Sequence, residues 1–163
     1  MISKTLQDKT NEQIKNELYS AYLYLSMSAY FEGMNLPGFA HWMRVQSQEE
    51  ATHAMKFFNH LIDRSARVVL HAIDQPPSEF KSALDVFQQA LAHEQKVTAL
   101  INDLYALAIR ENDYPAQVEL QWFISEQVEE EKSASEIVGL LQLVGEHGAS
   151  LLMLDRQLGA RAG

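Results

Sequence analysis

The chain has 163 residues, 47% of them hydrophobic, and carries a formal net charge of −9, so it is long enough for one domain with a continuous core. It contains no cysteine, which excludes disulfides, zinc fingers and iron–sulfur clusters and leaves carboxylate, amide and imidazole groups as metal ligands. We expect one cytoplasmic domain over residues 1–163 that binds neither nucleic acid nor membrane. The net charge repels phosphates, and neither a secretory signal nor an apolar run of roughly 18 residues is present.

Glycine and proline are few and clustered, so they mark the boundaries of long helical segments. The predicted helices cover about residues 5–32, 37–64, 82–112, 115–145 and, as a short fifth segment, 148–159. Pro37 and Pro115 suit the first turn of a helix, and the hydroxyl of Ser82 can cap the third helix. The prediction is therefore four long helices and one short one.

The second, third and fourth helices carry heptad stripes that are apolar except at their middle. The predicted stripes are Phe39, Met43, Gln46, Glu50, Ala54, Phe57 and Leu61; Phe87, Leu91, Glu94, Thr98, Ile101, Tyr105 and Ala108; and Leu120, Phe123, Gln127, Glu130, Ala134, Ile137, Leu141 and Val144. Stripes of this kind are typical of helices packed in a bundle.

The connections predict the topology of this bundle. Short loops join the first helix to the second and the third to the fourth, which makes both pairs antiparallel. The roughly 17 residues of segment 65–81 reach about 55 Å when extended, whereas a helix of ~28 residues is about 42 Å long. The expected fold is all-α: an antiparallel four-helix bundle with one long crossover between helices 2 and 3 and a short C-terminal helix.

Polar side chains interrupt the stripes at one level of the bundle. They are Glu17, Glu50, Glu94, Gln127 and Glu130, with His53 three residues after Glu50 on the same face. A buried carboxylate needs a counter-charge, and no lysine or arginine falls on these stripes at that level. The pattern therefore indicates a bound cation.

An internal repeat brings these side chains together. Glu17 precedes Glu50 by 33 residues, and Glu94 precedes Gln127 by the same number. Two glutamates from two helices, with Glu-x-x-His from two others, form the site of di-iron bundle proteins. Here only the first half keeps Glu-x-x-His, because Gln127 and Glu130 stand at the second pair of positions.

Four segments give the chain a specific resemblance over essentially its whole length. Residues 17–27 (ELYSAYLYLSM), 48–53 (QEEATH), 93–94 (HE) and 126–131 (EQVEEE) resemble those of the prokaryotic non-haem ferritins. The resemblance implies that Glu17, Glu50 and His53 hold one iron. It implies further that Glu94 holds a second iron bridged by Glu50, and that Gln127 and Glu130 complete the surroundings.

The resemblance also implies roles outside the pair. Glu49, Glu126 and Glu129, with Glu130, match a third iron site; the alternative is a solvated acidic face. Tyr24 would take a redox or hydrogen-bonding role, or serve only in packing. Bacterioferritins carry a haem-ligating methionine directly after the second-helix glutamate; this chain has Ala51 there, so no haem is expected. We assign nothing to His41, His60, His71, His93 and His147, which show no partner in the pattern.

The resemblance implies a ferroxidase that converts Fe(II) to Fe(III) with O2 or peroxide and stores the product in a hollow homo-oligomeric shell of about 24 chains, closed in part by the short fifth helix. A non-storage di-iron oxidase or peroxidase, or an iron-detoxifying relative, is the alternative. A rubrerythrin-type peroxidase would need a second Glu-x-x-His and a cysteine-ligated iron, which are missing. DNA-protecting ferritin-like proteins place their ligands between subunits, and a purely structural bundle needs no core carboxylates.

Overall fold

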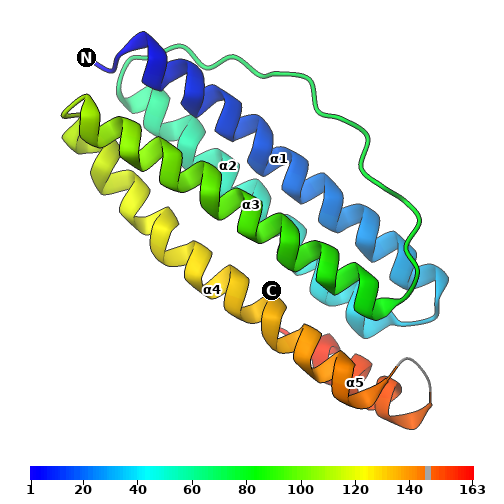
Figure 1. The fold of residues 1–163 in the computed structure, drawn as a ribbon. Coiled ribbons are helices and arrows are strands. Elements are labelled where there is room, and N and C mark those ends of the chain that lie inside the picture. Colours follow the sequence, from blue (N-terminus) through cyan, green and yellow to red (C-terminus); the bar gives the residue numbers. More distant parts are fainter. Residues whose placement is uncertain (146–147) are drawn as a thin grey trace.

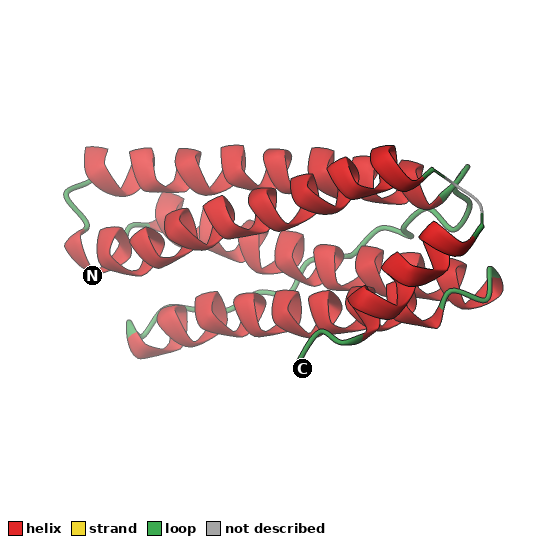
Figure 2. Ribbon diagram, turned by 90° about the horizontal axis from the view of Figure 1, so that it is seen from below, coloured by secondary structure: helices red, strands yellow, loops and turns green. Residues whose placement is uncertain are grey.

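A computed structural model describes residues 1–145 and 148–163 of the chain. All regular elements within these residues are helices: α1 (Lys4–Gly33), α2 (Pro37–Asp63), α3 (Ala83–Arg110), α4 (Tyr114–Val144) and α5 (Ala149–Gly159). The four long helices lie along one another, and α5 lies at one end of this bundle (Figures 1 and 2). In the described ranges, none of the helices is both long and apolar enough to cross a membrane. The predicted four-helix bundle with a short fifth helix is confirmed.

Side-chain caps mark where three of the long helices, α1, α3 and α4, begin. The hydroxyl of Ser82 accepts the backbone N–H of Asp85 at 3.1 Å, so the predicted cap of α3 is confirmed. Ser3 accepts the N–H of Leu6 in α1, and Asp113 caps α4 in the same way. Each cap satisfies an amide that has no partner inside its helix.

The crossover between α2 and α3 runs the length of the bundle, as predicted, and makes these two helices parallel (Figure 1). It is tied to α1 along the way. The Asn11 side chain donates to the carbonyl of Arg67 at 3.0 Å and accepts the N–H of Val69 at 2.9 Å, and Ser26 donates to the carbonyl of Pro77 at 2.6 Å. These bonds pair backbone groups of an otherwise irregular segment.

The core stripes of α2 and α4 are confirmed, apart from the half-buried Val144, but the stripe predicted for α3 is wrong at alternate positions. Ala90, Val97 and Leu104 are buried where Leu91, Thr98 and Tyr105 were expected; the latter three are half-buried. Both sets alternate steps of three and four residues from Phe87, so the sequence pattern alone does not choose between them. The structure shows that the small Ala90 and the branched Val97 face the core.

A polar layer divides the core into two apolar clusters. One cluster surrounds Phe31, Phe39 and Phe87, near α5; the other surrounds Phe57 and Phe123, whose rings stack with centroids 3.9 Å apart. The predicted polar residues are all buried between them: Glu17, Glu50, His53, Glu94, Gln127 and Glu130. The bundle thus positions six polar side chains from four helices at one level.

Helix α5 is fixed against the N-terminal end of α2 at very short range. The Asp155 carboxylate accepts the backbone N–H of Phe39 at 2.9 Å. A Cβ atom on Gly38 would lie only 1.7 Å from the carbonyl oxygen of Asp155. Glycine is therefore required at this contact, because any side chain would push α5 away from the bundle.

Candidate metal centre

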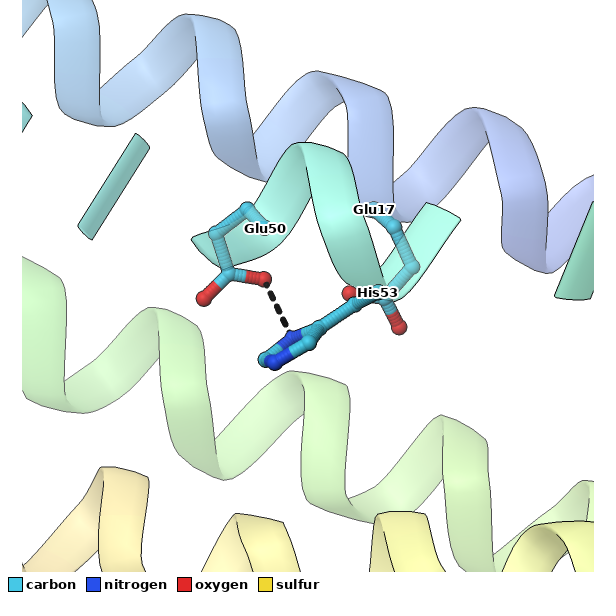
Figure 3. Close-up of side chains that lie close together, drawn as sticks. All are labelled: Glu17, Glu50 and His53. Carbon is cyan, nitrogen blue, oxygen red and sulfur yellow. Dashed lines mark ion pairs between the residues drawn. The ribbon is translucent and has the colours of Figure 1, made fainter. Parts of the chain in front are cut away.

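The first group of converging ligands comes from α1 and α2. Glu17, Glu50 and His53 are buried, and one ligand atom from each lies within 4.8 Å of the others. Their side chains point toward one another, and His53 Nδ1 lies 3.3 Å from Glu50 Oε2 (Figure 3). Gln13 donates to Glu17 Oε1 at 2.7 Å, whereas Glu17 Oε2 is buried with no hydrogen-bond partner among the described residues. A buried carboxylate oxygen without a donor is suited to a cation.

A second group adds ligands from α3 and α4. Glu50, Glu94 and Glu130 are buried, with one carboxylate oxygen of each within 4.8 Å of the others. Glu50 belongs to both groups, so its two oxygens can serve two cations. The arrangement therefore suits a pair of metal ions bridged by one carboxylate.

The four carboxyl groups are held in an environment that opposes their ionisation without a cation. Burial is the main cause of the raised pKa values of Glu17, Glu50 and Glu94, and it raises the pKa of Glu130 to about 8. Charges on neighbouring carboxylates raise the pKa further: Glu50 acts on Glu17, and Glu94 acts on both Glu50 and Glu130. A bound divalent ion would reverse this effect, because it stabilises the ionised carboxylates.

Tyr24 and Gln127 surround Glu94 as hydrogen-bond donors. The Tyr24 hydroxyl donates to Glu94 Oε1, and Gln127 Nε2 donates to Glu94 Oε2 at 3.1 Å. Burial, then the Glu94 charge, raises the pKa of Tyr24 well above its ordinary value, so the phenol remains a neutral donor. Both side chains thus orient a carboxylate of the second group, and Gln127 directs its amide nitrogen toward it.

The structure brings only part of the predicted third-site set together. Ligand atoms of His53, Glu126 and Glu130 lie within 4.8 Å of one another at the edge of the pair. The half-exposed Glu49 instead accepts a charged hydrogen bond from Arg161 Nη2 at 2.7 Å. Glu129 is exposed on α4.

Several contacts around the centre were missed by the sequence interpretation. Gln46 donates a hydrogen bond to Glu130, and Arg161 donates one to Gln46. Gln46 lay within the predicted stripe of α2, but no sequence pattern pointed to Arg161. His93 and His41, to which the sequence pattern assigned no role, both have a partner in the structure. His93 Nε2 lies 2.7 Å from Ser20 Oγ, and burial lowers its pKa to about 4, while His41 Nε2 lies 2.8 Å from the Arg161 carbonyl. His147 lies outside the described residues.

Comparison with known proteins gives one family. The model of the ferritin-like domain matches residues 7–144. The bacterial non-heme ferritin of Bacteroides fragilis (strain 638R) is 42% identical over 161 residues, covering 99% of this chain and 100% of that protein. That of Escherichia coli O157:H7 is 37% identical, covering 97% and 96%.

The fold comparison agrees. An open-pore ferritin from the hyperthermophilic archaeon Archaeoglobus fulgidus superposes with a TM-score of 0.98 at 48% identity, covering 99% of this chain and 100% of that one. Together these matches confirm the predicted resemblance and, with it, an iron-storage protein. The chain belongs to the family of non-haem ferritins.

Proposed function

We propose that this ferritin oxidises ferrous iron at the paired metal site before storing it. The observation that carries the proposal is the position of Glu50, which is shared by two buried groups of ligands within one chain. A single structural ion would need only one such group. Two ions bridged by a carboxylate can instead deliver two electrons to one oxidant.

The donor set suits iron as the substrate. Carboxylate oxygens and one imidazole bind ferrous iron, and the carboxylate charges favour the ferric state further. Glu17, Glu50 and His53 would hold the first iron, and Glu50, Glu94 and Glu130 the second. Each ferrous ion gives up one electron, and O2 or peroxide accepts both, so the site avoids a lone one-electron step. Ferric product then leaves for storage.

Tyr24 and Gln127 would act on the second iron through its ligand Glu94. Both hold Glu94 by hydrogen bonds, so they would orient the carboxylate that binds this iron. Gln127 stands where a symmetric site would carry a glutamate, and a neutral amide binds ferric iron less strongly than a carboxylate. The second iron should therefore leave more readily than the first.

We further propose a third iron site at the acidic edge, formed by Glu49, Glu126, Glu129 and Glu130, that receives iron in transit. The convergence of Glu126 and Glu130 on His53 supports it. Crystals soaked in ferrous iron should show three peaks, the third weaker, and the third should vanish in Glu49→Ala/Glu129→Ala. The exposed pair Glu79→Ala/Glu136→Ala is the matched control. Three equally strong peaks in Glu49→Ala/Glu129→Ala would show that these glutamates form only a solvated acidic face.

We propose that residues 1–163 form one domain of a cytoplasmic subunit that assembles with copies of itself into a hollow shell of about 24 chains. Exposed apolar side chains on α1 and the crossover, including Tyr22, Leu25 and Leu70, support burial between subunits. Light scattering over several salt concentrations should give a particle far larger than a dimer. Monomers or dimers alone would count against a storage shell.

The ferroxidase proposal is tested by removing one ligand from each group. Glu94→Ala and His53→Ala should slow oxidation of the first two irons per chain by about 100-fold or more, because each leaves an ion without a direct ligand. Glu136→Ala and His71→Ala change exposed residues of the same types and should oxidise iron normally. Stopped-flow ultraviolet absorbance measures the rate. Wild-type rates in both ligand variants would refute the assignment.

A further inference from the structure

The C-terminal residues return to the middle of the bundle after α5 ends. Both views place the C-terminus about halfway along the long helices (Figures 1 and 2). There Arg161 lies against one face of α2, with its guanidinium 4.4 Å from the centroid of the Trp42 ring. It donates to the Trp42 carbonyl at 3.3 Å, to Gln46 Oε1 at 3.1 Å and to Glu49 Oε2 at 2.7 Å. Four contacts thus fix one side chain at the level of the metal centre.

Gln46 connects this arginine to the metal ligands. Its side chain is buried, and its Nε2 donates to Glu50 Oε1 at 3.0 Å and to Glu130 Oε2 at 2.6 Å. A guanidinium can only donate hydrogen bonds, so Arg161 requires the amide oxygen of Gln46 on its own side. The amide nitrogen must then face the two carboxylates.

We propose that Arg161 is a positioning residue of the metal centre. By fixing the amide of Gln46, it holds Glu50 and Glu130 in the orientation in which they bind the second metal ion. The C-terminal segment is then part of the centre, although it supplies no ligand. This inference rests on the proposed paired site.

A simple charge effect would have the opposite sign. If Arg161 acted only as a nearby positive charge, its removal would relieve repulsion and tighten cation binding. Glu49 already neutralises that charge, and Gln46 lies between the guanidinium and the ligands. Positioning instead predicts weaker binding without Arg161. Loss of a residue that orients a ligand typically costs 10–100-fold in metal affinity, and we expect the lower end because Arg161 acts through Gln46.

The experiment is an anaerobic titration of the metal-free protein with Co²⁺, followed by calorimetry and visible absorption. In Arg161→Gln the second Co²⁺ should bind about tenfold more weakly with an altered spectrum, while the first, which keeps Glu17 and His53, should change by about twofold or less. Arg161→Lys keeps a positively charged donor on a longer side chain than glutamine and should recover part of the loss. Arg156→Gln removes an exposed charge from α5 and should match the wild type. Circular dichroism and light scattering confirm fold and assembly in every variant.

A double-mutant cycle tests whether Arg161 acts through Gln46. Gln46→Met should weaken the second Co²⁺ at least as much as Arg161→Gln, and the double variant should lose no more than Gln46→Met alone. Additive losses, or an unchanged or tighter second Co²⁺ in Arg161→Gln, would overturn the inference. Fewer than two Co²⁺ per chain in the wild type would refute the paired site itself, and the inference with it.

Discussion

Replacing Glu130 with glutamine should make the metal-free protein more stable, by an amount that grows with pH. The pKa of Glu130 is raised from its ordinary 4.5 to about 8, chiefly by burial and then by the charge of Glu94. Above pH 4.5 the unfolded chain releases this proton while the folded chain keeps it. Stability is therefore lost as pH rises toward 8, at about 1.4 kcal/mol per unit, which reaches about 3 kcal/mol by pH 7.

Glutamine at position 130 removes this titration and keeps an oxygen to accept the Gln46 hydrogen bond. The neighbouring titratable side chains remain in both proteins: Glu50, Glu94, His53, Glu49 and Glu126. For a chain of this length, about 3 kcal/mol corresponds to a melting temperature about 6 to 12 °C higher at pH 7. Near pH 5 the difference in stability should fall below about 1 kcal/mol, because the unfolded chain only begins to release this proton above its own pKa of 4.5.

Scanning calorimetry of chelator-treated protein from pH 5 to pH 8 measures this difference. Glu136→Gln changes an exposed residue of the same helix and should show no pH-dependent gain in melting temperature. A melting difference between Glu130→Gln and wild type that stays constant across this range would refute the reasoning. With Zn²⁺ bound, the order should reverse, because the wild type then gains a carboxylate ligand.

Three further changes test the surroundings of the centre. Tyr24→Phe should leave both metals bound but slow their oxidation by about tenfold, measured by stopped-flow absorbance, because only a donor to a ligand is lost. Gly38→Ala should expose α5 to limited proteolysis, since the new Cβ meets Asp155 at 1.7 Å; Gly139→Ala, with nothing within 4 Å of its Cβ, should not. Asp113→Asn keeps the α4 cap but loses its ion pair and should lower stability by about 1 to 3 kcal/mol in calorimetry.

The fold was predictable because its signals are local. Pro37 and Ser82 mark helix starts through backbone chemistry that depends on few neighbours, and the crossover is long enough to span the bundle and so allow parallel helices 2 and 3. Which face of α3 is buried, by contrast, depends on the other helices of the bundle. Leu91 is more hydrophobic than Ala90, yet Ala90 is buried and Leu91 is half-buried. The close packing of the neighbouring helices decides this, and it cannot be read from the α3 sequence alone.

The candidate site likewise has a part that the sequence predicted and a part that it did not. The repeat spacing placed Glu17, Glu50, Glu94 and Gln127 at one level, because a bundle converts equal separations into equal heights. Arg161 could not be placed, since its position depends on how α5 docks and how the last residues turn. The ligand roles themselves remain predictions until metal binding is measured.

The polar layer between the two apolar clusters has an evolutionary consequence. Every buried carboxylate there replaces an apolar side chain that would join the two halves into one core and stabilise the bundle. A descendant released from metal chemistry would gain stability from almost any leucine in this layer, so neutral drift would erase it quickly. An intact layer in a divergent sequence is therefore a sign of continuing selection for metal binding.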